Sequence, residues 1–409
     1  MLSLIMILRP QYLEKLQKLR DKDLIKVITG VRRCGKSTLL QMFQQKLISD
    51  GVSSKQIQYY NFEDPQNLIW VDKWLDLYNH IISKAIKSKK NYIFLDEIQN
   101  IGDFERLADG LFVKKGIDLY ITGSNAYFLS KDIATILSGR MFEIKVFPLS
   151  FSEYISSFSD KSNLSDKFEK YIKFGALPRI LDFQDNQGLI LEYLQGIYST
   201  VLLKDVVNRP GINDQDVLKD ISGFMLDNIG NITAAKKIAD TLTSKGRAIS
   251  HSTVDKYISA LADSLLFYPV DKIGLKGRKR LYSQKKFYTI DTGFRQLILG
   301  SDQTNEDRGH LLENIVYLEL LRRYPKVNFG KVDDKEVDFV VMTQQGYTEY
   351  YQIAWSVRDE ETYQREISPL ESIKDHNTKY LLTIDPEESV NNGIRQKNII
   401  SWLLDNPNY

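Results

Sequence analysis

The stretch VITGVRRCGKSTLL, residues 27–40, decides how the first third of this chain folds. The apolar run 25–29 predicts a short buried strand, and the residues after Lys36 have the periodicity of a helix. Between them the glycine, lysine and serine spacing is Gly-x-x-x-x-Gly-Lys-Ser, from Gly30 to Ser37. Between a strand and a helix, this spacing predicts a loop whose backbone N–H groups converge on phosphate oxygens. A chance glycine-containing loop is the alternative.

Each residue type in this loop suits a phosphate site. The two glycines permit the tight turn, and the helix N-terminus adds partial positive charge. Lys36 can reach the outer phosphates of a nucleotide, and the Ser37 hydroxyl can ligate magnesium. The predicted nucleotide-binding residues are Gly30, Val31, Arg32, Arg33, Cys34, Gly35, Lys36, Ser37 and Thr38.

A second apolar run ends in two acidic residues. NYIFLDEIQN, residues 91–100, predicts a strand that is followed by Asp96 and Glu97. Asp96 is placed to hold a magnesium ion through water. Glu97 is the candidate to orient and polarise the attacking water. Two acids after a strand could instead cap a helix.

Two further positions could act on a bound nucleotide. IDLYITGSN, residues 117–125, predicts another buried strand that ends in Ser124 and Asn125. An amide at this strand end can sense the γ-phosphate or the lytic water, or it can be a turn residue. Arg140 precedes the next strand and could reach the nucleotide of a neighbouring subunit in a homo-oligomer. The alternative is a surface arginine.

These pieces resemble AAA-type ATPases, and in particular one prokaryotic subfamily. The resemblance implies ATP binding and magnesium at Lys36, Ser37 and Asp96, with Glu97 as catalytic base. It also implies a sensor at Asn125 or Ser124 and a finger at Arg140. In that family the ATPase module precedes a C-terminal region with nuclease-like features in many members. The resemblance spans nearly the whole chain and rests on VITGVRRCGKSTLL, YYNFED, IFLDEIQN, ITGSNAYFLS, LSGRMFEIKVFPLSFSEY, NIGNITAAKKIAD and DTGFRQLILG.

The stretch FGALP, residues 174–178, departs from the family pattern. Relatives usually have two glycines there. The stretch lies in a helical region, residues 150–215, that predicts a small lid over the nucleotide. Arg179 or Arg209 could contact phosphate from this lid, or either could serve solvent contact or lid packing. The departure therefore concerns the geometry of the lid and not the nucleotide site.

The composition limits the fold and the compartment. A chain of 409 residues exceeds one ordinary core. We expect an α/β protein: a P-loop AAA-type parallel sheet (1–149), the helical lid (150–215), a winged helix (216–292) and a restriction-nuclease-like α/β domain (300–409). No run of eighteen apolar residues is present, so we expect no membrane span.

The content of cysteine, histidine and charge narrows the chemistry further. The single cysteine excludes an intramolecular disulfide and favours the reducing cytoplasm. With only four histidines, any metal is expected on oxygen ligands. The net charge of +2 neither demands nor excludes a polyanionic partner. Cys34 inside the phosphate loop offers redox control of ATP binding as one interpretation, and a tolerated small residue is the alternative.

Two helical patterns and a basic hairpin predict the winged helix. The expected buried faces are Ala235, Ile238, Ala239 and Leu242, then Val254, Tyr257, Ile258 and Leu261. The second helix would offer DNA its exposed residues His251, Thr253, Asp255 and Lys256. The hairpin would offer phosphates the basic residues Lys272, Lys276, Arg278, Lys279, Arg280, Lys285 and Lys286. Because the second helix is poor in Arg, Asn and Gln, only non-specific contact is expected. A solvated hairpin used for protein contacts is the alternative.

The tail has the order α-β-β-β-α-β, which resembles the core of restriction-enzyme-like nucleases. In that fold Glu313 and Asp338 would ligate magnesium, a third acid would follow, and a lysine two residues later would activate water. Here those last two positions are Gln352 and Ala354. Lys331 and Lys335 are the candidates to replace that lysine, although each lies on another strand. Glu336 should share a face with Asp338. We therefore expect a catalytically degenerate nuclease fold, with an active but atypical nuclease as the alternative.

Three functions follow for the whole chain. The first is an ATP-driven conformational switch that moves the winged helix and the tail against DNA or a partner protein. The second is an ATP-licensed nuclease. The third is a scaffold that binds nucleotide without turnover and holds a protein partner. The intact Asp96–Glu97 pair argues for turnover, because a pure nucleotide binder has no use for the second acid.

Overall fold

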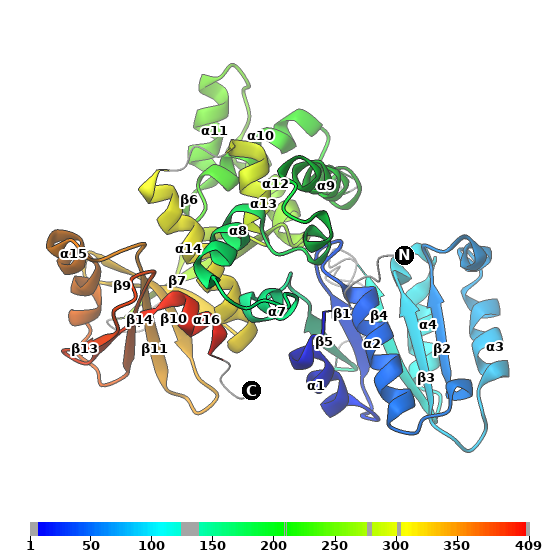
Figure 1. Ribbon diagram of the computed structural model, residues 1–409. Helices are drawn as coiled ribbons and strands as arrows, with labels where there is room; N and C mark the ends of the chain where they lie inside the picture. The colour runs from blue at the N-terminus through cyan, green and yellow to red at the C-terminus, as the bar shows by residue number, and fades with distance from the viewer. Residues whose placement is uncertain are drawn as a thin grey trace. The chain divides into compact units, whose positions relative to one another are not determined.

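The computed structural model describes residues 7–123, 139–207, 209, 211–275, 280–300 and 304–405. The chain divides into two compact units (Figure 1). The first holds residues 1–148 together with 263–265, and the second holds residues 149–262 and 266–409. Within the described ranges, no helix combines the length and the apolar content needed to cross a bilayer.

The first unit is built on a parallel sheet of five strands in the order β2-β3-β4-β1-β5 (Figure 1). Its strands are β1 (Ile25–Thr29), β2 (Ile57–Asn61), β3 (Asn91–Asp96), β4 (Ile117–Gly123) and β5 (Met141–Lys145). Its helices are α1 (Pro10–Leu19), α2 (Lys36–Ser49), α3 (Trp74–Lys84) and α4 (Phe104–Phe112), with 3-10 turns at Ser54–Gln56, Pro65–Trp70 and Ile98–Asn100. The predicted α/β class and parallel first sheet are confirmed.

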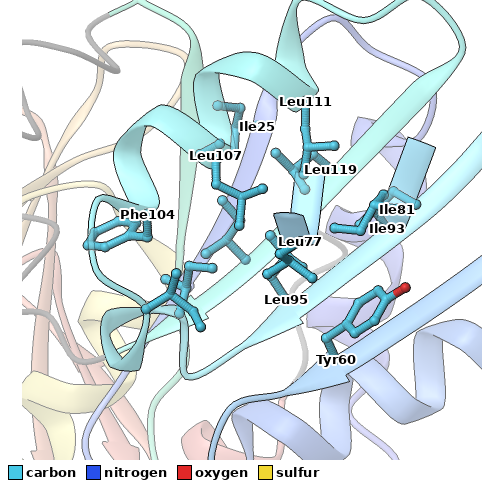
Figure 2. Close-up of a cluster of buried hydrophobic side chains, with 14 of the residues drawn as sticks. Ile25, Tyr60, Leu77, Ile81, Ile93, Leu95, Phe104, Leu107, Leu111 and Leu119 are labelled. Carbon is cyan, nitrogen blue, oxygen red and sulfur yellow. The ribbon is translucent and has the colours of Figure 1, made fainter. Parts of the chain in front are cut away.

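Apolar side chains cover both faces of this sheet, as a fully buried parallel sheet requires. On one face, α3 and α4 pack against alternate residues of the strands (Figure 2). The labelled side chains in that view are Ile25, Tyr60, Leu77, Ile81, Ile93, Leu95, Phe104, Leu107, Leu111 and Leu119. On the other face Phe43 of α2 meets Phe94 and Tyr120, which stack with their ring centroids 4.8 Å apart. The sheet therefore holds the loop after β1 and the acids after β3 at the same edge.

The second unit is built on a mixed sheet of nine strands in the order β13-β14-β12-β11-β10-β9-β7-β8-β6 (Figure 1). Its strands are β6 (Ile232–Thr233), β7 (Phe267–Gly274), β8 (Arg280–Thr289), β9 (Val327–Val332), β10 (Lys335–Met342), β11 (Thr348–Ile353), β12 (Thr378–Thr383), β13 (Ser389–Asn391) and β14 (Ile394–Asn398). The parallel pairing of β7 with β9 joins the predicted wing strands and the predicted tail strands in one sheet.

Helices surround this sheet, and two of them match the predicted helix pair. The helices are α7 (Phe151–Ser156), α8 (Leu164–Phe174), α9 (Gln187–Thr200), α10 (Gln215–Asp227), α11 (Ala235–Ser244), α12 (His251–Asp263), α13 (Thr292–Leu299), α14 (Asn305–Arg323), α15 (Glu360–Glu371) and α16 (Ile399–Leu404), with a 3-10 turn at Pro178–Phe183 and a π-helical turn at Val201–Val206. Most of the predicted apolar faces of α11 and α12 are buried. The predicted lid helices α8 and α9 pack on α13 inside this unit.

The stretch FGALP, which departs from the family pattern, packs against the buried carboxylate of Asp291. Gly175 has φ +79°, and a Cβ there would lie 1.6 Å from Asp291 Oδ1. The backbone N–H of Ala176 donates to Asp291 Oδ2 at 2.7 Å, and Ala176 has an ordinary negative φ. The geometry therefore requires a glycine at the first position and tolerates alanine at the second.

Gly175→Ala should lower the free energy of unfolding by at least about 2 kcal/mol, because it adds backbone strain and a clash with Asp291. Urea denaturation followed by fluorescence measures this loss. Gly196→Ala is the matched control, since its Cβ would meet open space on α9. That control should be as stable as the wild type, or slightly more stable. Wild-type stability in Gly175→Ala would show that the loop relaxes around the added methyl group.

Candidate functional site

The predicted phosphate loop connects β1 to α2 in the first unit. Gly30 has φ +157°, and a Cβ there would lie 2.3 Å from the Val146 carbonyl oxygen and 2.7 Å from Cys34 Sγ. Gly35, with φ +101°, precedes the first residue of α2. A side chain at position 30 would clash with these atoms, and the positive φ at position 35 favours glycine over other residues. The loop is fixed in a tight curl at the N-terminus of a helix of fourteen residues.

A buried arginine outside the loop holds it in place through hydrogen bonds to backbone carbonyl oxygens. Arg9, at the start of α1, donates to the carbonyl oxygen of Cys34 at 3.1 Å and to that of Phe147 at 2.9 Å. Its side chain is almost fully buried. Cys34 is buried as well, and burial raises the pKa of its thiol. A buried thiol with a raised pKa is a poor nucleophile, which supports the structural role for Cys34 over redox control. Sequence reasoning missed Arg9, because only the folded chain brings it to the loop.

Lys36 links the phosphate loop to the two acids at the end of β3. Its ammonium group donates to the Gly30 carbonyl oxygen at 3.0 Å and lies 3.7 Å from Glu97 Oε1. Only 7% of the lysine side chain is exposed. The structure therefore brings together two residues that the sequence places sixty-one positions apart. Both were predicted to contact the outer phosphates or the attacking water.

One hydroxyl group holds both acids. Thr122, near the end of β4, donates to Asp96 Oδ1 and accepts from the Glu97 backbone N–H at 2.9 Å. Tyr59 on β2 donates to Asp96 Oδ2 at 2.7 Å. Burial and the Asp96 carboxylate raise the pKa of the Tyr59 hydroxyl, so it remains a donor. Both carboxylate oxygens of Asp96 are thus oriented by side chains of the two neighbouring strands.

Glu97 has an unusual backbone and a close side-chain partner. Its φ of +55° lies in the left-handed region, which a non-glycine residue enters only when the surroundings impose it. Gln99 Nε2 donates to Glu97 Oε2 at 2.5 Å. The carboxylate therefore lies between the Gln99 amide and the Lys36 ammonium. Tyr59, Gln99 and Thr122 had no predicted role, although all three lie in stretches that carry the family resemblance.

The other predicted nucleotide-site residues do not contact the phosphate loop in the part of the chain that the structure describes, or they lie outside that part. Arg140 precedes β5 and lies at the N-terminal ends of the parallel strands, whereas the phosphate loop follows the C-terminal end of β1. It forms an ion pair with Asp109. It is not brought to the phosphate loop of its own chain. Ser124 and Asn125 lie outside the described residues. Of the two lid arginines, Arg179 is exposed, and Arg209 donates to the Asp205 carbonyl oxygen at 3.0 Å.

The second unit contains a separate polar cavity of about 970 Å³. The predicted residues Glu313, Asp338 and Gln352 all line it, and Glu336 joins them. Ala354 also lines the cavity and belongs to the apolar core beneath α15. The structure therefore assembles the predicted nuclease-like residues at one place. Lys335 is held by Ser368 and Ser372, and Lys331 pairs with Asp334 at 3.7 Å, so neither replaces the absent lysine.

A lysine from the predicted wing enters this cavity instead. Lys286 of β8 is 4% exposed and lies 3.1 Å from Glu313, 2.5 Å from Glu336 and 4.0 Å from Asp338. Burial alone would lower the pKa of Lys286, but the carboxylates of Glu313, Asp338 and Glu336 raise it above its ordinary value. The lysine is therefore an ammonium ion at neutral pH. Its burial, and that of Lys272, removes two members from the predicted basic DNA-binding patch.

Comparison with known proteins assigns a known type of domain to most of the first unit. Residues 22–155 match the family model of an AAA domain, and residues 165–305 match that of a domain of unknown function (DUF8612). An uncharacterized protein of Haemophilus influenzae is 36% identical over 408 residues, which are 98% of this chain and 100% of the relative. An uncharacterized protein of Methanocaldococcus jannaschii is 32% identical over 370 residues, which are 86% of this chain and 79% of the relative. A Walker-type ATPase of Pyrococcus abyssi aligns with a TM-score of 0.47 and 17% identity, over 71% of this chain and 95% of that one.

Proposed function

The chain belongs to one family with its Haemophilus influenzae relative and carries an AAA domain of the P-loop ATPase type, and on that premise we propose that it hydrolyses ATP at the phosphate loop. Glu97 acts as the general base, and Lys36 binds the outer phosphates. The observation that carries this proposal is that the Lys36 ammonium group lies 3.7 Å from the Glu97 carboxylate. Thr122 bonds to the Asp96 carboxylate and to the Glu97 backbone, so it holds the two acids next to each other. A site built only to bind a nucleotide would have no need for a second, oriented carboxylate.

Magnesium is the cation that this proposal requires. The Ser37 hydroxyl and the Asp96 carboxylate are hard oxygen donors, the class that Mg²⁺ prefers. Thr122 and Tyr59 already donate to the two oxygens of Asp96, so we expect Asp96 to hold the ion through bound water. When bound with ATP, the ion neutralises charge on the transferred phosphate. The oxygen donors of Ser37 and Asp96 therefore fit a magnesium ion.

The proposed use of hydrolysis is a conformational switch. Asn125 or Ser124 would sense the γ-phosphate, and Arg140 would act on a neighbouring subunit's nucleotide. The second unit would transmit the change to DNA or to a protein partner. The exposed His251, Asp255 and Lys256 on α12 support a contact surface there. Lys272 and Lys286 point inward and are not available to DNA, whereas Lys276, Arg278 and Lys279 of the predicted patch lie outside the described residues. Weak, non-specific contact remains the form of DNA binding that we propose.

Phosphate release from ATP tests the proposed function. We expect turnover in the presence of Mg²⁺ and its loss when EDTA removes the ion. ATP binding without phosphate release would instead favour the nucleotide-binding scaffold. Repeating the measurement with duplex DNA at several salt concentrations tests the proposed partner, because stimulation through phosphate contacts should fall steeply as salt rises. DNA stimulation that salt leaves unchanged would contradict such contacts.

A further inference from the structure

The cavity of the second unit is organised around the ammonium group of Lys286. Three carboxylates, from α14 and β10, lie within 4.0 Å of this one nitrogen atom. A buried charge is tolerated when opposite charges surround it. Here three carboxylates face one ammonium group. Lys286 is therefore held by ion pairs and is not a free basic group.

Helix α14 fixes the strand that carries this lysine. Tyr288, two residues further along β8, donates to Glu313. Asn314 exchanges two hydrogen bonds with the backbone of Thr289, at 2.8 and 2.9 Å. Because residues 286 and 288 share one face of the strand, these contacts hold the Lys286 side chain inside the cavity. Lys286 is thus part of the built structure of the site.

The stretch NIGNIT closes the cavity from another side. Gly230, with φ +76°, comes so close that a Cβ there would lie 2.9 Å from His310 Nδ1 and 3.0 Å from Glu313 Oε2. Its backbone N–H donates to the Phe287 carbonyl oxygen at 3.1 Å. This stretch had no assigned role in the sequence. Its glycine allows the loop to approach both β8 and α14.

A nuclease-like site would hold a divalent metal ion between Glu313, Asp338 and residue 352, and the residues present do not fit such an ion. Gln352 Oε1 faces the Asp338 backbone N–H at 3.4 Å, and its Nε2 donates to Glu366 at 3.0 Å. Asp338 Oδ2 accepts from the Ile353 backbone N–H at 2.8 Å. Across the described ranges, no group of three or more His, Cys, Asp or Glu side chains is arranged to hold a metal ion.

We propose that Lys286 is the resident cation of this cavity and excludes a divalent metal ion from the carboxylates of Glu313, Glu336 and Asp338. The site differs from a metal-dependent nuclease site in two ways: it lacks the lysine at position 354, and its cation position is filled by the chain itself. This assignment is independent of ATP hydrolysis in the first unit.

Mn²⁺ binding to the nucleotide-free full-length protein, followed by electron paramagnetic resonance, tests the proposal. Wild type should bind Mn²⁺ at the cavity at least tenfold more weakly than Lys286→Met. The double variant Lys286→Met with Asp338→Asn should lose the gained site, which separates it from any ion at Ser37 and Asp96. Lys335→Met is the matched control and should gain nothing, because Lys335 is bonded to two serines outside the cavity.

Removing Lys286 leaves buried carboxylates unpaired, so thermal unfolding checks that the variant folds. Mn²⁺ should raise the unfolding temperature of Lys286→Met and not that of wild type. Lys286→Gln, whose amide can still donate hydrogen bonds, serves if the methionine variant does not fold. Two results would overturn the proposal: tight Mn²⁺ binding by wild type that Asp338→Asn abolishes, or a folded Lys286 variant with no gain in Mn²⁺ affinity.

Discussion

Glu97→Gln is expected to lower the rate of ATP hydrolysis by at least about 10²-fold, the usual contribution of a general base, while ATP binding is retained. Glutamine keeps the size of the side chain, and its one amide oxygen can still accept the hydrogen bond from Gln99. It cannot take a proton from water. Since the left-handed backbone of Glu97 is held by Thr122, the substitution should leave the geometry of the site intact.

Two measurements on Glu97→Gln separate chemistry from binding. Steady-state phosphate release gives the turnover rate, and the nucleotide that stays with the protein after gel filtration gives retention of ATP. Glu105→Gln, in the first turn of α4, is the matched control and should hydrolyse ATP like the wild type. If Glu97→Gln turned over at the wild-type rate, another group would have to activate the water.

The predicted site residues that the structure brings together are those whose placement depends on neighbours along the chain. Gly30, Gly35 and Lys36 lie within one short stretch, and Asp96 and Glu97 lie at the end of one strand. Local hydrophobic patterns suffice to place such residues at strand ends. The contacts of Thr122 and Tyr59 with Asp96 could not be found in this way. They depend on the strand order β2-β3-β4, which only the folded sheet determines.

Lys286 shows a different limit of the sequence. The hairpin was predicted as a strand pair, and adjacent lysines at 285 and 286 were both counted as basic groups for DNA. Successive side chains of a strand point to opposite faces, and here the face that carries Lys286 is covered by Glu313 and Glu336. Lys285 is partly exposed and lies near Asp271, whereas Lys286 is buried. Which lysine turns inward follows from the pairing of β7 with β9, which unites the hairpin with the tail sheet.

The same union changes the interpretation of Ala354. From the sequence alone, this alanine was the residue that indicated a lost nuclease site. In the structure its methyl group belongs to the apolar core that includes Val340 and Leu370. The positive charge nearest the acids comes from β8, outside the segment in which a nuclease motif would be sought. A lysine that reaches the acids from another part of the sheet cannot be recognised by spacing.

Lys36→Met is expected to weaken ATP binding by about 10- to 100-fold, because a hydrogen bond to a charged group contributes about 1.5–3 kcal/mol. The ammonium group donates to the Gly30 carbonyl oxygen and lies 3.7 Å from Glu97, so the fold places it at the phosphate loop. Methionine has a similar length and fills the same buried space without a charge. Hydrolysis should fall further than binding, since the lysine would also neutralise charge on the transferred phosphate.

A fluorescent ATP analogue measures the dissociation constant of this variant, and thermal unfolding confirms its fold. Lys46→Met on the same helix α2 is the control, because Lys46 is 40% exposed and pairs only with Asp50 among the described ion pairs. It should bind ATP like the wild type. The comparison with ADP adds a second test: a lysine that contacts the outer phosphates should contribute more to ATP affinity than to ADP affinity. Equal affinity of wild type and Lys36→Met for ATP would remove the phosphate loop from the proposed site, because no other described lysine lies in that loop.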